Sequence, residues 1–200
     1  MNKREFFNQM APVWDERYYS RELFRRLDEM VGSFGLSKGD CVLDVGCGTG
    51  GLIPSLLKIL SPSGVIHAID FAEEMVKRAK KKFEDYQNVH FILGSVETLP
   101  FDEASFNYVI CFGAFPHFNG KEKALKEMHR VLKTGGYLFI AHALSSVEIK
   151  AHHKTSSPVS TDVLPEEPEM MDMMNRTGFW GVSIIDKDGC YICKGKKELI

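Results

Sequence analysis

A segment that reads as strand, glycine turn and helix carries the residues best suited to bind a ligand. Residues 42–50 read VLDVGCGTG, so a short apolar run that contains one acid, Asp44, breaks into alternating glycines. Glycine has no Cβ and tolerates positive φ, so Gly46, Gly48 and Gly50 would let a ligand approach bare backbone. The ten residues that follow read as a helix. This architecture typically directs free N–H groups at a nucleotide-like ligand.

The glycine spacing is compatible with two kinds of cofactor. Gly46, Gly48 and Gly51 satisfy the dinucleotide pattern G-x-G-x-x-G, which by itself is a weak signal. Asp44 favours a different ligand, because a carboxylate two residues before the first glycine would face an amine or ordered water and would repel a pyrophosphate. The chain also reads as one doubly wound domain without room for a separate catalytic domain.

Five blocks of the sequence resemble motifs of the class I S-adenosylmethionine-dependent methyltransferases, and they occur in the order of that family across residues 41–142. The blocks are residues 42–50 (motif I), 65–70 (the second strand with its terminal acid), 94–101 (the adenine-side loop), 106–118 (the fourth strand and its exit) and 130–138 (the turn into the fifth strand). One block would be a weak indication, but five in register identify the chain as similar to this family.

The resemblance implies a cofactor role for each matching residue. Asp44 would engage the amino group of S-adenosylmethionine, directly or through water, or cap the turn that follows it. Asp70 would accept the two ribose hydroxyls, with capping of the next helix as the alternative. Phe71 would lie against adenine or belong to the core. The complete set of expected cofactor-binding residues is Asp44, Gly46, Cys47, Gly48, Gly50, Asp70, Phe71, Ser95, Val96, Cys111 and Phe112.

The sequence departs from the common pattern of the family at two positions. Ser95 stands where the adenine loop often carries an aspartate, and a neutral hydroxyl makes a weaker hydrogen bond than a carboxylate. The backbone of Val96 would still be able to read the adenine ring. Asn107 replaces the common acid before the fourth strand and is expected to be structural. The side-chain hydrogen bond to adenine is therefore expected to be weaker than in members that carry the aspartate.

The acceptor side is expected to come from the segments that surround the family core. Residues 1–20 are interpreted as a lid segment and residues 142–174 as an acceptor-side insertion within a single domain, 1–200. His117 matches a histidine common in small-molecule members of the family. It would act as a base for the acceptor or, in the more frequent role of such a histidine, as a packed hinge.

Three histidines and an acid in the insertion are also of the types that bind zinc or iron: His142, His152, His153 and Asp162. Adjacent residues on a helix point about 100° apart, so His152 and His153 would not share a face as ligands spaced four residues apart do. We therefore expect no stoichiometric metal. Recognition of the acceptor by one of these groups stays open.

The pattern of short apolar runs and helical spacing predicts an α/β fold. Buried parallel strands are predicted at residues 41–45, 65–69, 89–93, 107–112 and 136–142, with helices at 23–34, 51–60, 75–83, 124–132 and 167–177. Asp188-Gly189 favours a hairpin between two final runs. The resemblance implies a doubly wound, mostly parallel seven-stranded sheet with helices on both faces, to which this hairpin would add an antiparallel C-terminal strand.

The composition is typical of a compact cytoplasmic enzyme. Of 200 residues, 44% are hydrophobic, which is enough to fill a sizeable core. The formal net charge of −2 predicts neither a nucleic-acid nor a membrane-surface partner, and no apolar run approaches the length of a membrane span. The N-terminus does not read as a signal peptide, and five cysteines in a chain of this size are expected to be reduced.

Together these features predict methyl transfer from S-adenosylmethionine to a small-molecule acceptor, with the oligomeric state open. The glycine spacing leaves an NAD-dependent oxidoreductase as one alternative. The other alternative is a non-catalytic regulatory or partner subunit that binds the cofactor without an acceptor site.

Overall fold

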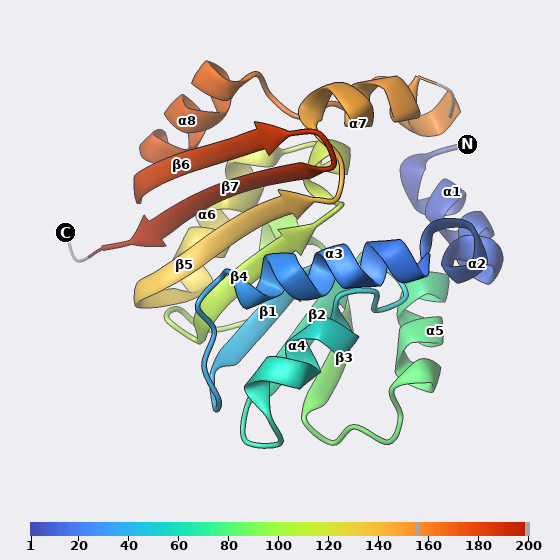
Figure 1. Ribbon diagram of the computed structural model, residues 1–200, viewed down its shortest axis with the longest axis horizontal. Coiled ribbons are helices and arrows are strands. Elements are labelled where there is room, and N and C mark those ends of the chain that lie inside the picture. The colour runs from blue at the N-terminus through green and yellow to red at the C-terminus, as the bar shows by residue number, and fades with distance from the viewer. Residues whose placement is uncertain (155–156, 199–200) are drawn as a thin grey trace.

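A seven-stranded, mostly parallel sheet forms the centre of the protein in the computed structural model, which describes residues 1–154 and 157–198 (Figure 1). The strand order is β3-β2-β1-β4-β5-β7-β6, and β7 runs antiparallel to both of its neighbours. The predicted fold class is thereby confirmed. The strands are β1 (Cys41–Val45), β2 (Val65–Asp70), β3 (Val89–Leu93), β4 (Phe106–Phe112), β5 (Leu132–His142), β6 (Phe179–Lys187) and β7 (Cys190–Lys197).

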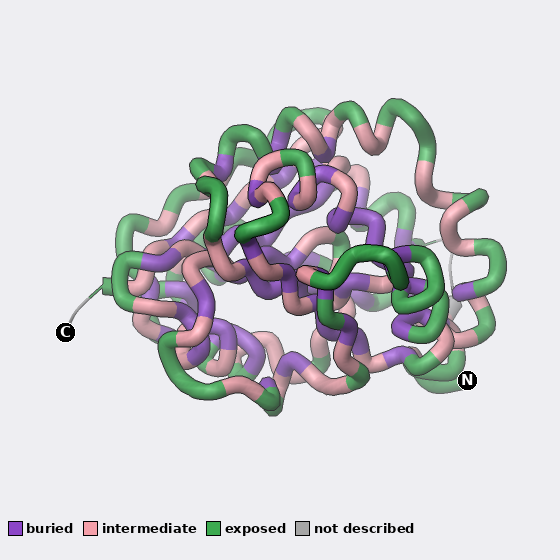
Figure 2. Tube along the Cα trace, turned by 90° about the horizontal axis from the view of Figure 1, so that it is seen from below, coloured by how far each residue is buried: buried purple, intermediate pink, exposed green. Residues whose placement is uncertain are grey.

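Helices cover both faces of the sheet and bury a separate hydrophobic cluster on each. One face carries α3 (Arg21–Gly32), α4 (Ile53–Leu60) and α5 (Glu73–Lys82), and the other carries α6 (Lys121–Val131) and α8 (Glu167–Arg176). Each of these helices turns the apolar stripe predicted from its spacing towards the strands. The burial pattern in Figure 2 follows from this arrangement, with buried residues through the middle and exposed ones along the outer turns.

The remaining helices gather at the edge of the sheet to which the parallel strands point (Figure 1). They are α1 (Lys3–Met10), α2 (Trp14–Tyr18) and α7 (Ser146–His153), with single 3₁₀ turns at Ala11–Val13, Val96–Thr98, Phe115–His117 and Ser157–Val159. α7 begins with a capping box in which the Ser145 hydroxyl accepts from the Glu148 N–H and the Glu148 carboxylate accepts from the Ser145 N–H.

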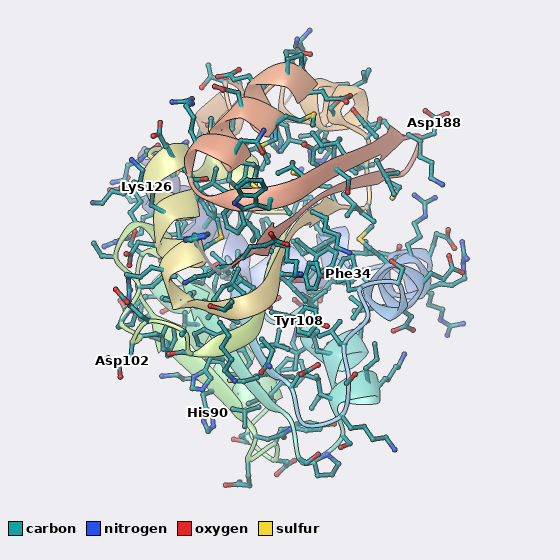
Figure 3. The ribbon with its side chains drawn as sticks, turned by 90° about the vertical axis from the view of Figure 1, so that its left-hand side faces the viewer. Phe34, His90, Asp102, Tyr108, Lys126 and Asp188 are labelled. Atoms are coloured by element: carbon teal, nitrogen blue, oxygen red, sulfur yellow. The ribbon has the colours of Figure 1, made fainter. Side chains whose placement is uncertain are left out.

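The opposite end of the molecule is held by aromatic contacts. Phe34, just beyond α3, stacks on Phe139 with 3.9 Å between the ring centroids. The Tyr108 hydroxyl donates a 2.8 Å hydrogen bond to the carbonyl of Gly35, and Figure 3 shows Phe34 and Tyr108 close together in this region. These contacts fix α3 against β4 and β5. In the described part of the chain, no helix is long and apolar enough to cross a membrane.

Candidate active site

A cavity of about 730 Å³ lies at the carboxyl ends of β1, β2, β4 and β5. β1 and β4 are neighbours in the sheet, but the helices that follow them, α4 and α6, pack on opposite faces. Such a reversal of direction is the place where open α/β sheets bind ligands. Residues of α1, α2, α3 and α7 complete the wall, so the segments outside the family core border the same space.

Nine of the eleven residues expected to bind the cofactor line this cavity, and two do not. Gly50 and Cys111 are the exceptions. The residues in the lining are Asp44, Gly46, Cys47, Gly48, Asp70, Phe71, Ser95, Val96 and Phe112. Residues from the ends of three strands and from the adenine-side loop are thus brought to one place by the parallel arrangement.

The glycine turn after β1 adopts the left-handed backbone that its composition predicts. The φ angles of Gly46, Gly48 and Gly50 are 72°, 53° and 86°. The N–H groups of Gly46 and Cys47 both donate to the Ile69 carbonyl, and those of Gly48 and Gly50 also donate within the protein. The expectation that this turn directs free N–H groups at a ligand is therefore wrong for these four residues. At Gly46 and Gly48 the turn presents backbone without a side chain to the cavity wall.

Two of the glycines are also required by close packing. A Cβ at Gly46 would lie 2.3 Å from the Cβ of Ala114, and a Cβ at Gly50 would lie 2.6 Å from the ring of Phe83. Gly50 therefore serves the contact between the turn and the end of α5. This packing role explains why it is absent from the cavity wall.

Asp44 is a buried carboxylate at the floor of the cavity. Its side chain is 1% exposed, and its Oδ2 atom has no hydrogen-bond partner among the described residues. Burial, together with the nearby charge of Asp70, raises the pKa of Asp44 to about 8. A cationic group bound in the cavity would relieve the cost of ionising this carboxylate.

Asp70 occupies the end of β2 and organises the surrounding backbone. Its Oδ2 accepts from the Gly48 N–H at 2.9 Å, and its Oδ1 accepts from the Ala72 N–H at 2.8 Å. Burial raises the pKa of Asp70 above its usual value. Each oxygen keeps a second lone pair, so these contacts leave room for ligand hydroxyls. Asp70 thus lines the cavity and also orders the turn before α5.

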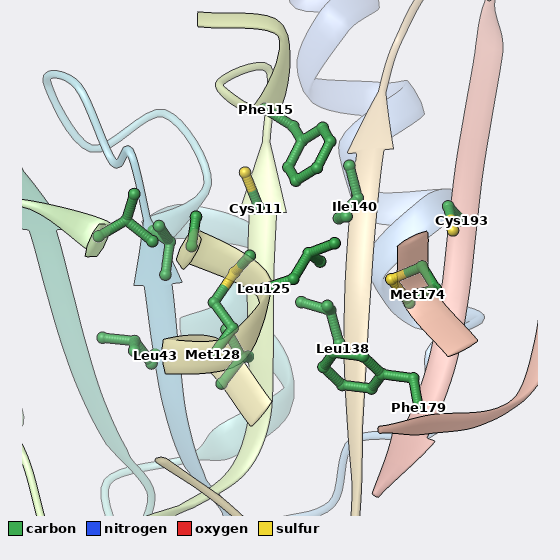
Figure 4. Close-up of a cluster of buried hydrophobic side chains, with 14 of the residues drawn as sticks. Leu43, Cys111, Phe115, Leu125, Met128, Leu138, Ile140, Met174, Phe179 and Cys193 are labelled. Carbon is green, nitrogen blue, oxygen red and sulfur yellow. The ribbon is translucent and has the colours of Figure 1, made fainter. Parts of the chain in front are cut away.

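Cys111 belongs to the hydrophobic core and not to the cavity. Its side chain is fully buried among the residues between the sheet and α6, where Figure 4 shows it on β4 near Phe115. Successive residues of a strand point to opposite faces, so the neighbouring Phe112 reaches the cavity when Cys111 does not. Cys111 was expected to bind the cofactor, but its side chain lies in the core and does not line the cavity.

The adenine-side loop contributes Ser95, Val96 and Glu97 to the wall. The Ser95 hydroxyl accepts from the Glu97 N–H at 3.2 Å and starts a 3₁₀ turn, so this side chain has a local structural role as well. The Glu97 carboxylate accepts from the Gly120 N–H at 3.0 Å. Phe71 lines the cavity and packs edge-to-face against Phe7 of α1, with 5.8 Å between the ring centroids.

The N-terminal segment is joined to the glycine turn by a polar contact that sequence reasoning missed. Asp15 accepts a hydrogen bond from the Thr49 hydroxyl and forms an ion pair with Lys82 of α5. The hydroxyl of Tyr19 lies 3.3 Å from the Thr49 hydroxyl, and Tyr19 lines the cavity. No motif or spacing marks Asp15, because its partners are remote in the chain.

The candidate base His117 also lines the cavity. Its Nδ1 atom lies 2.8 Å from Oδ2 of Asp162, a pairing that the sequence did not indicate. Burial lowers the pKa of His117, although the Asp162 carboxylate opposes that effect. The packed 3₁₀ turn around His117 is also compatible with the hinge role.

The histidines of the insertion approach the same region of the cavity. His142, His152 and His153 all line it, and burial lowers the pKa of His142 to about 3. Asp162 is held by His117 and Lys3, and its backbone carbonyl is bound by Nδ1 of His153. Within residues 1–154 and 157–198, no three histidine, cysteine or acidic side chains are grouped closely enough to hold a metal ion.

Known proteins match this chain in both sequence and fold. A profile of the methyltransferase domain matches residues 42–136. The demethylmenaquinone methyltransferase of Staphylococcus aureus (strain JH9) is 41% identical over 107 residues. That match covers 54% of this chain and 44% of the relative, so the chain aligns with less than half the length of the curated relatives it matches.

Two solved structures share the fold at low sequence identity. An S-adenosylmethionine-dependent methyltransferase from Aquifex aeolicus superposes with a TM-score of 0.73 at 23% identity, covering 98% of each chain. Phosphoethanolamine N-methyltransferase 2 of Haemonchus contortus, in complex with S-adenosylhomocysteine and phosphomonomethylethanolamine, superposes with a TM-score of 0.74 at 15% identity, over 88% of this chain and 53% of the other. The motif blocks in register, the methyltransferase-domain match over residues 42–136 and the seven-stranded sheet all support the class I S-adenosylmethionine-dependent methyltransferase family.

Proposed function

We propose that this protein transfers the methyl group of S-adenosylmethionine to a small organic acceptor. The observation that carries the proposal is Asp44, a buried carboxylate with an unpartnered oxygen beside a turn in which Gly46 and Gly48 have no side chains. The ammonium group of the cofactor would supply the positive charge that such a carboxylate needs. A dinucleotide would instead bring a pyrophosphate, which the same carboxylate would repel.

The cavity wall supports a division of roles among the cofactor-binding residues. Gly46, Cys47 and Gly48 would lie against the methionine part, and Asp70 would accept from the ribose hydroxyls. Three further residues, Phe71, Ser95 and Val96, would border the adenine ring. Phe112 would lie near the methyl group. The packing role of Gly50 removes it from direct contact in this proposal.

The chemistry of the reaction belongs to the cofactor, whose sulfonium carries a methyl group open to in-line attack by a nucleophile. The residues of this chain would bind the two reactants, hold them in line and exclude water. Residues 1–20 would act as the lid, because Trp14, Tyr18 and Tyr19 line the cavity and Asp15 binds the glycine turn. His117 would contact the acceptor.

An apolar, ring-shaped acceptor of the quinone type is the finer proposal. The relatives that match over 107 residues are named for demethylmenaquinone, a quinone. Apolar and aromatic side chains from four parts of the chain line the cavity in this protein, namely Phe7, Trp14, Phe112, Phe118 and Leu144. Such a wall favours a flat apolar molecule over a highly charged one.

Titration calorimetry tests the proposal directly. We expect S-adenosylhomocysteine and S-adenosylmethionine to bind with one site per chain, and NAD to give no binding heat at the same concentrations. Binding of NAD alone would contradict the assignment. Transfer of radiolabelled methyl from S-adenosylmethionine into a metabolite extract then separates an enzyme from a subunit that only binds the cofactor.

A further inference from the structure

Three segments that are remote in the sequence meet at Asp162, beside the cavity. The Asp162 carboxylate is 5% exposed, and its Oδ2 lies 2.8 Å from Nδ1 of His117. The ammonium group of Lys3, in α1, lies 2.7 Å from Oδ1 of the same carboxylate. Lys3 also donates to the His117 carbonyl at 3.0 Å and to Asn119 Oδ1 at 3.1 Å. The lid, the exit of β4 and the insertion are thus connected by one charged group.

We infer that Asp162 and Lys3 position His117 as the base that removes a proton from the methyl acceptor. The acceptor therefore carries a weakly acidic hydroxyl group on an apolar ring, which a quinone-type molecule has in its reduced form. The inference rests on the proposed function, and it adds two positioning residues and a chemical class of acceptor. His117 would be the catalytic residue, because it alone of the three would touch the acceptor proton.

The hydrogen bond to Asp162 decides which nitrogen of His117 is available. A carboxylate at Nδ1 holds the proton on that nitrogen and leaves the lone pair on Nε2. His117 is part of the cavity wall, whereas Asp162 lies behind it and is not. Nε2 is on the ring edge opposite the Nδ1 contact to Asp162, and in this proposal that edge faces the acceptor. This geometry is that of a base oriented by a carboxylate.

The surrounding groups keep Asp162 ionised and His117 neutral, which are the protonation states that the reaction needs. The hydrogen bonds from His117 and Lys3 outweigh burial and lower the pKa of Asp162, so this carboxylate stays ionised. Burial, His153 and Lys3 lower the pKa of His117, against the opposing effect of Asp162. His142, also in the wall, is held neutral by burial. His117 is therefore unprotonated near neutral pH and able to accept a proton.

The step balances without any further reactant. A bond forms between the methyl carbon and the attacking atom of the acceptor, and the sulfur–methyl bond breaks with its electron pair left on sulfur. The hydroxyl proton of the acceptor passes to Nε2 of His117. The positive charge lost by the sulfonium appears on the imidazole ring, where the Asp162 carboxylate stabilises it.

Aromatic side chains next to His117 and Asp162 favour an acceptor whose remaining surface is an apolar ring. Phe7 packs edge-to-face against His117 with 5.2 Å between the ring centroids, and Phe7 also contacts Trp14 at 5.7 Å. Both rings come from the same N-terminal segment as Lys3. Docking of this segment would therefore complete the ion pair and the apolar wall together, which favours a ring that carries a hydroxyl group.

The first experiment determines the tautomer of His117 by ¹⁵N NMR with S-adenosylhomocysteine bound. We expect Nδ1–H in the wild type and a loss of this preference in Asp162→Asn. The matched control is Asp28→Asn, which changes a carboxylate in the surface ion pair of α3 with Lys58. It should leave the His117 signals unchanged. A proton on Nε2 in the wild type, or no change in Asp162→Asn, would overturn the inference.

The second experiment measures methyl transfer to 1,4-dihydroxynaphthalene, kept reduced under argon, with 1,4-dimethoxynaphthalene as the probe without a hydroxyl proton. We expect transfer to the first only. Asp162→Asn and Lys3→Met should lower kcat by about 10- to 100-fold at pH 7. Their KM for S-adenosylmethionine should stay within about twofold, since neither residue is proposed to contact the cofactor. Lys58→Met is the control for the lysine and should match the wild type.

The pH profile separates a base from a structural role. As the pH approaches the pKa of the hydroxyl probe, the probe ionises by itself, so the defects of Asp162→Asn and Lys3→Met should shrink. A defect that is constant with pH would overturn the inference, as would absence of transfer while S-adenosylhomocysteine still binds. Failure of S-adenosylhomocysteine to bind the wild type would instead contradict the proposed function itself.

Discussion

Burial favours the protonated form of Asp44, whereas the proposed binding of an ammonium group favours the ionised form. An ionised carboxylate that is 1% exposed and lacks a partner for one oxygen destabilises the folded protein, and its pKa rises to about 8 as a result. Its folded pKa lies above the unfolded value of about 3.9, so the folded state binds more protons and stability falls as the pH rises between these two values. In the proposed site, Asp44 would therefore contribute to binding at the expense of stability.

Asp44→Asn should separate these two effects. At pH 8 we expect the variant without ligand to be more stable than the wild type by about 1–3 kcal/mol, and at pH 5 by much less, since the wild-type carboxyl is then protonated. Its affinity for S-adenosylhomocysteine should fall by about 1.5–3 kcal/mol. Urea unfolding and calorimetry measure both. Asp102→Asn, at an exposed carboxylate (Figure 3), is the control. An Asn variant that binds normally would remove Asp44 from the site.

Asp70→Ala should weaken cofactor binding and stability together. The ribose contacts are worth about 1.5–3 kcal/mol of affinity if two charge-assisted hydrogen bonds are lost. The Gly48 and Ala72 N–H groups would also lose their acceptor, so the free energy of unfolding should fall by about 1–3 kcal/mol. Ser95→Ala should cost less than about 1.5 kcal/mol of affinity, because its hydroxyl is neutral. A folded Asp70→Ala variant with wild-type affinity would restrict Asp70 to ordering the turn.

At the scale of elements, the glycine turn works through shape more than through free backbone donors. Its N–H groups at residues 46, 47, 48 and 50 are satisfied within the protein. Gly46 in this turn allows a close approach to Ala114, which follows β4. Thr49 in the same turn donates a hydrogen bond to Asp15 of α2. The N-terminal helices therefore depend on the turn for their position, and the cavity depends on both.

Gly46→Ala should be more harmful than the same change at Gly35. Both residues have positive φ, 72° and 80°, so each substitution carries backbone strain of about 1 kcal/mol. A Cβ at Gly46 would also lie 2.3 Å from Ala114, whereas nothing lies within 4 Å of one at Gly35. We expect a loss of affinity for S-adenosylhomocysteine only in Gly46→Ala, together with a larger fall in Tm. Equal effects of the two changes on stability and affinity would contradict this account.

At the scale of the whole molecule, ligand binding should stabilise the fold because the cavity is built from segments that are remote in the chain. Its walls include Lys3 in α1, Asp44 in β1 and His153 in α7. Loss of the global structure would therefore abolish the site, and a ligand bound only to the folded state shifts the unfolding equilibrium by mass action.

S-adenosylhomocysteine at 100 times its Kd should add about 2.7 kcal/mol of stability. For a chain of this size we expect a rise in Tm of about 5–10 °C, measured by calorimetry. NAD at the same concentration should give no rise. Prior treatment with a chelator should change neither the Tm nor the shift, as the spacing of the histidines predicts. A chelator-dependent Tm would reopen the metal interpretation of the insertion.

The sequence by itself determined the features that depend on local chemistry. Strands at 41–45 and 89–93 and the positive φ of the glycines are set by residues near one another in the chain. The order of the motif blocks indicated the family, and the strand order of that family brings Asp44 and Asp70 to one sheet edge. Periodicity and turn geometry are short-range effects, so sequence reasoning could reach them.

Only the tertiary structure decided the contacts between remote residues. His117 and Asp162 are 45 positions apart, Asp15 and Thr49 are 34 apart, and nothing in the pattern of either segment specifies its partner. The burial of Cys111 and the packing of Gly50 on Phe83 likewise depend on which elements face each other. Side-chain chemistry restricts what such groups can do, but the close packing of the folded chain decides which of them meet.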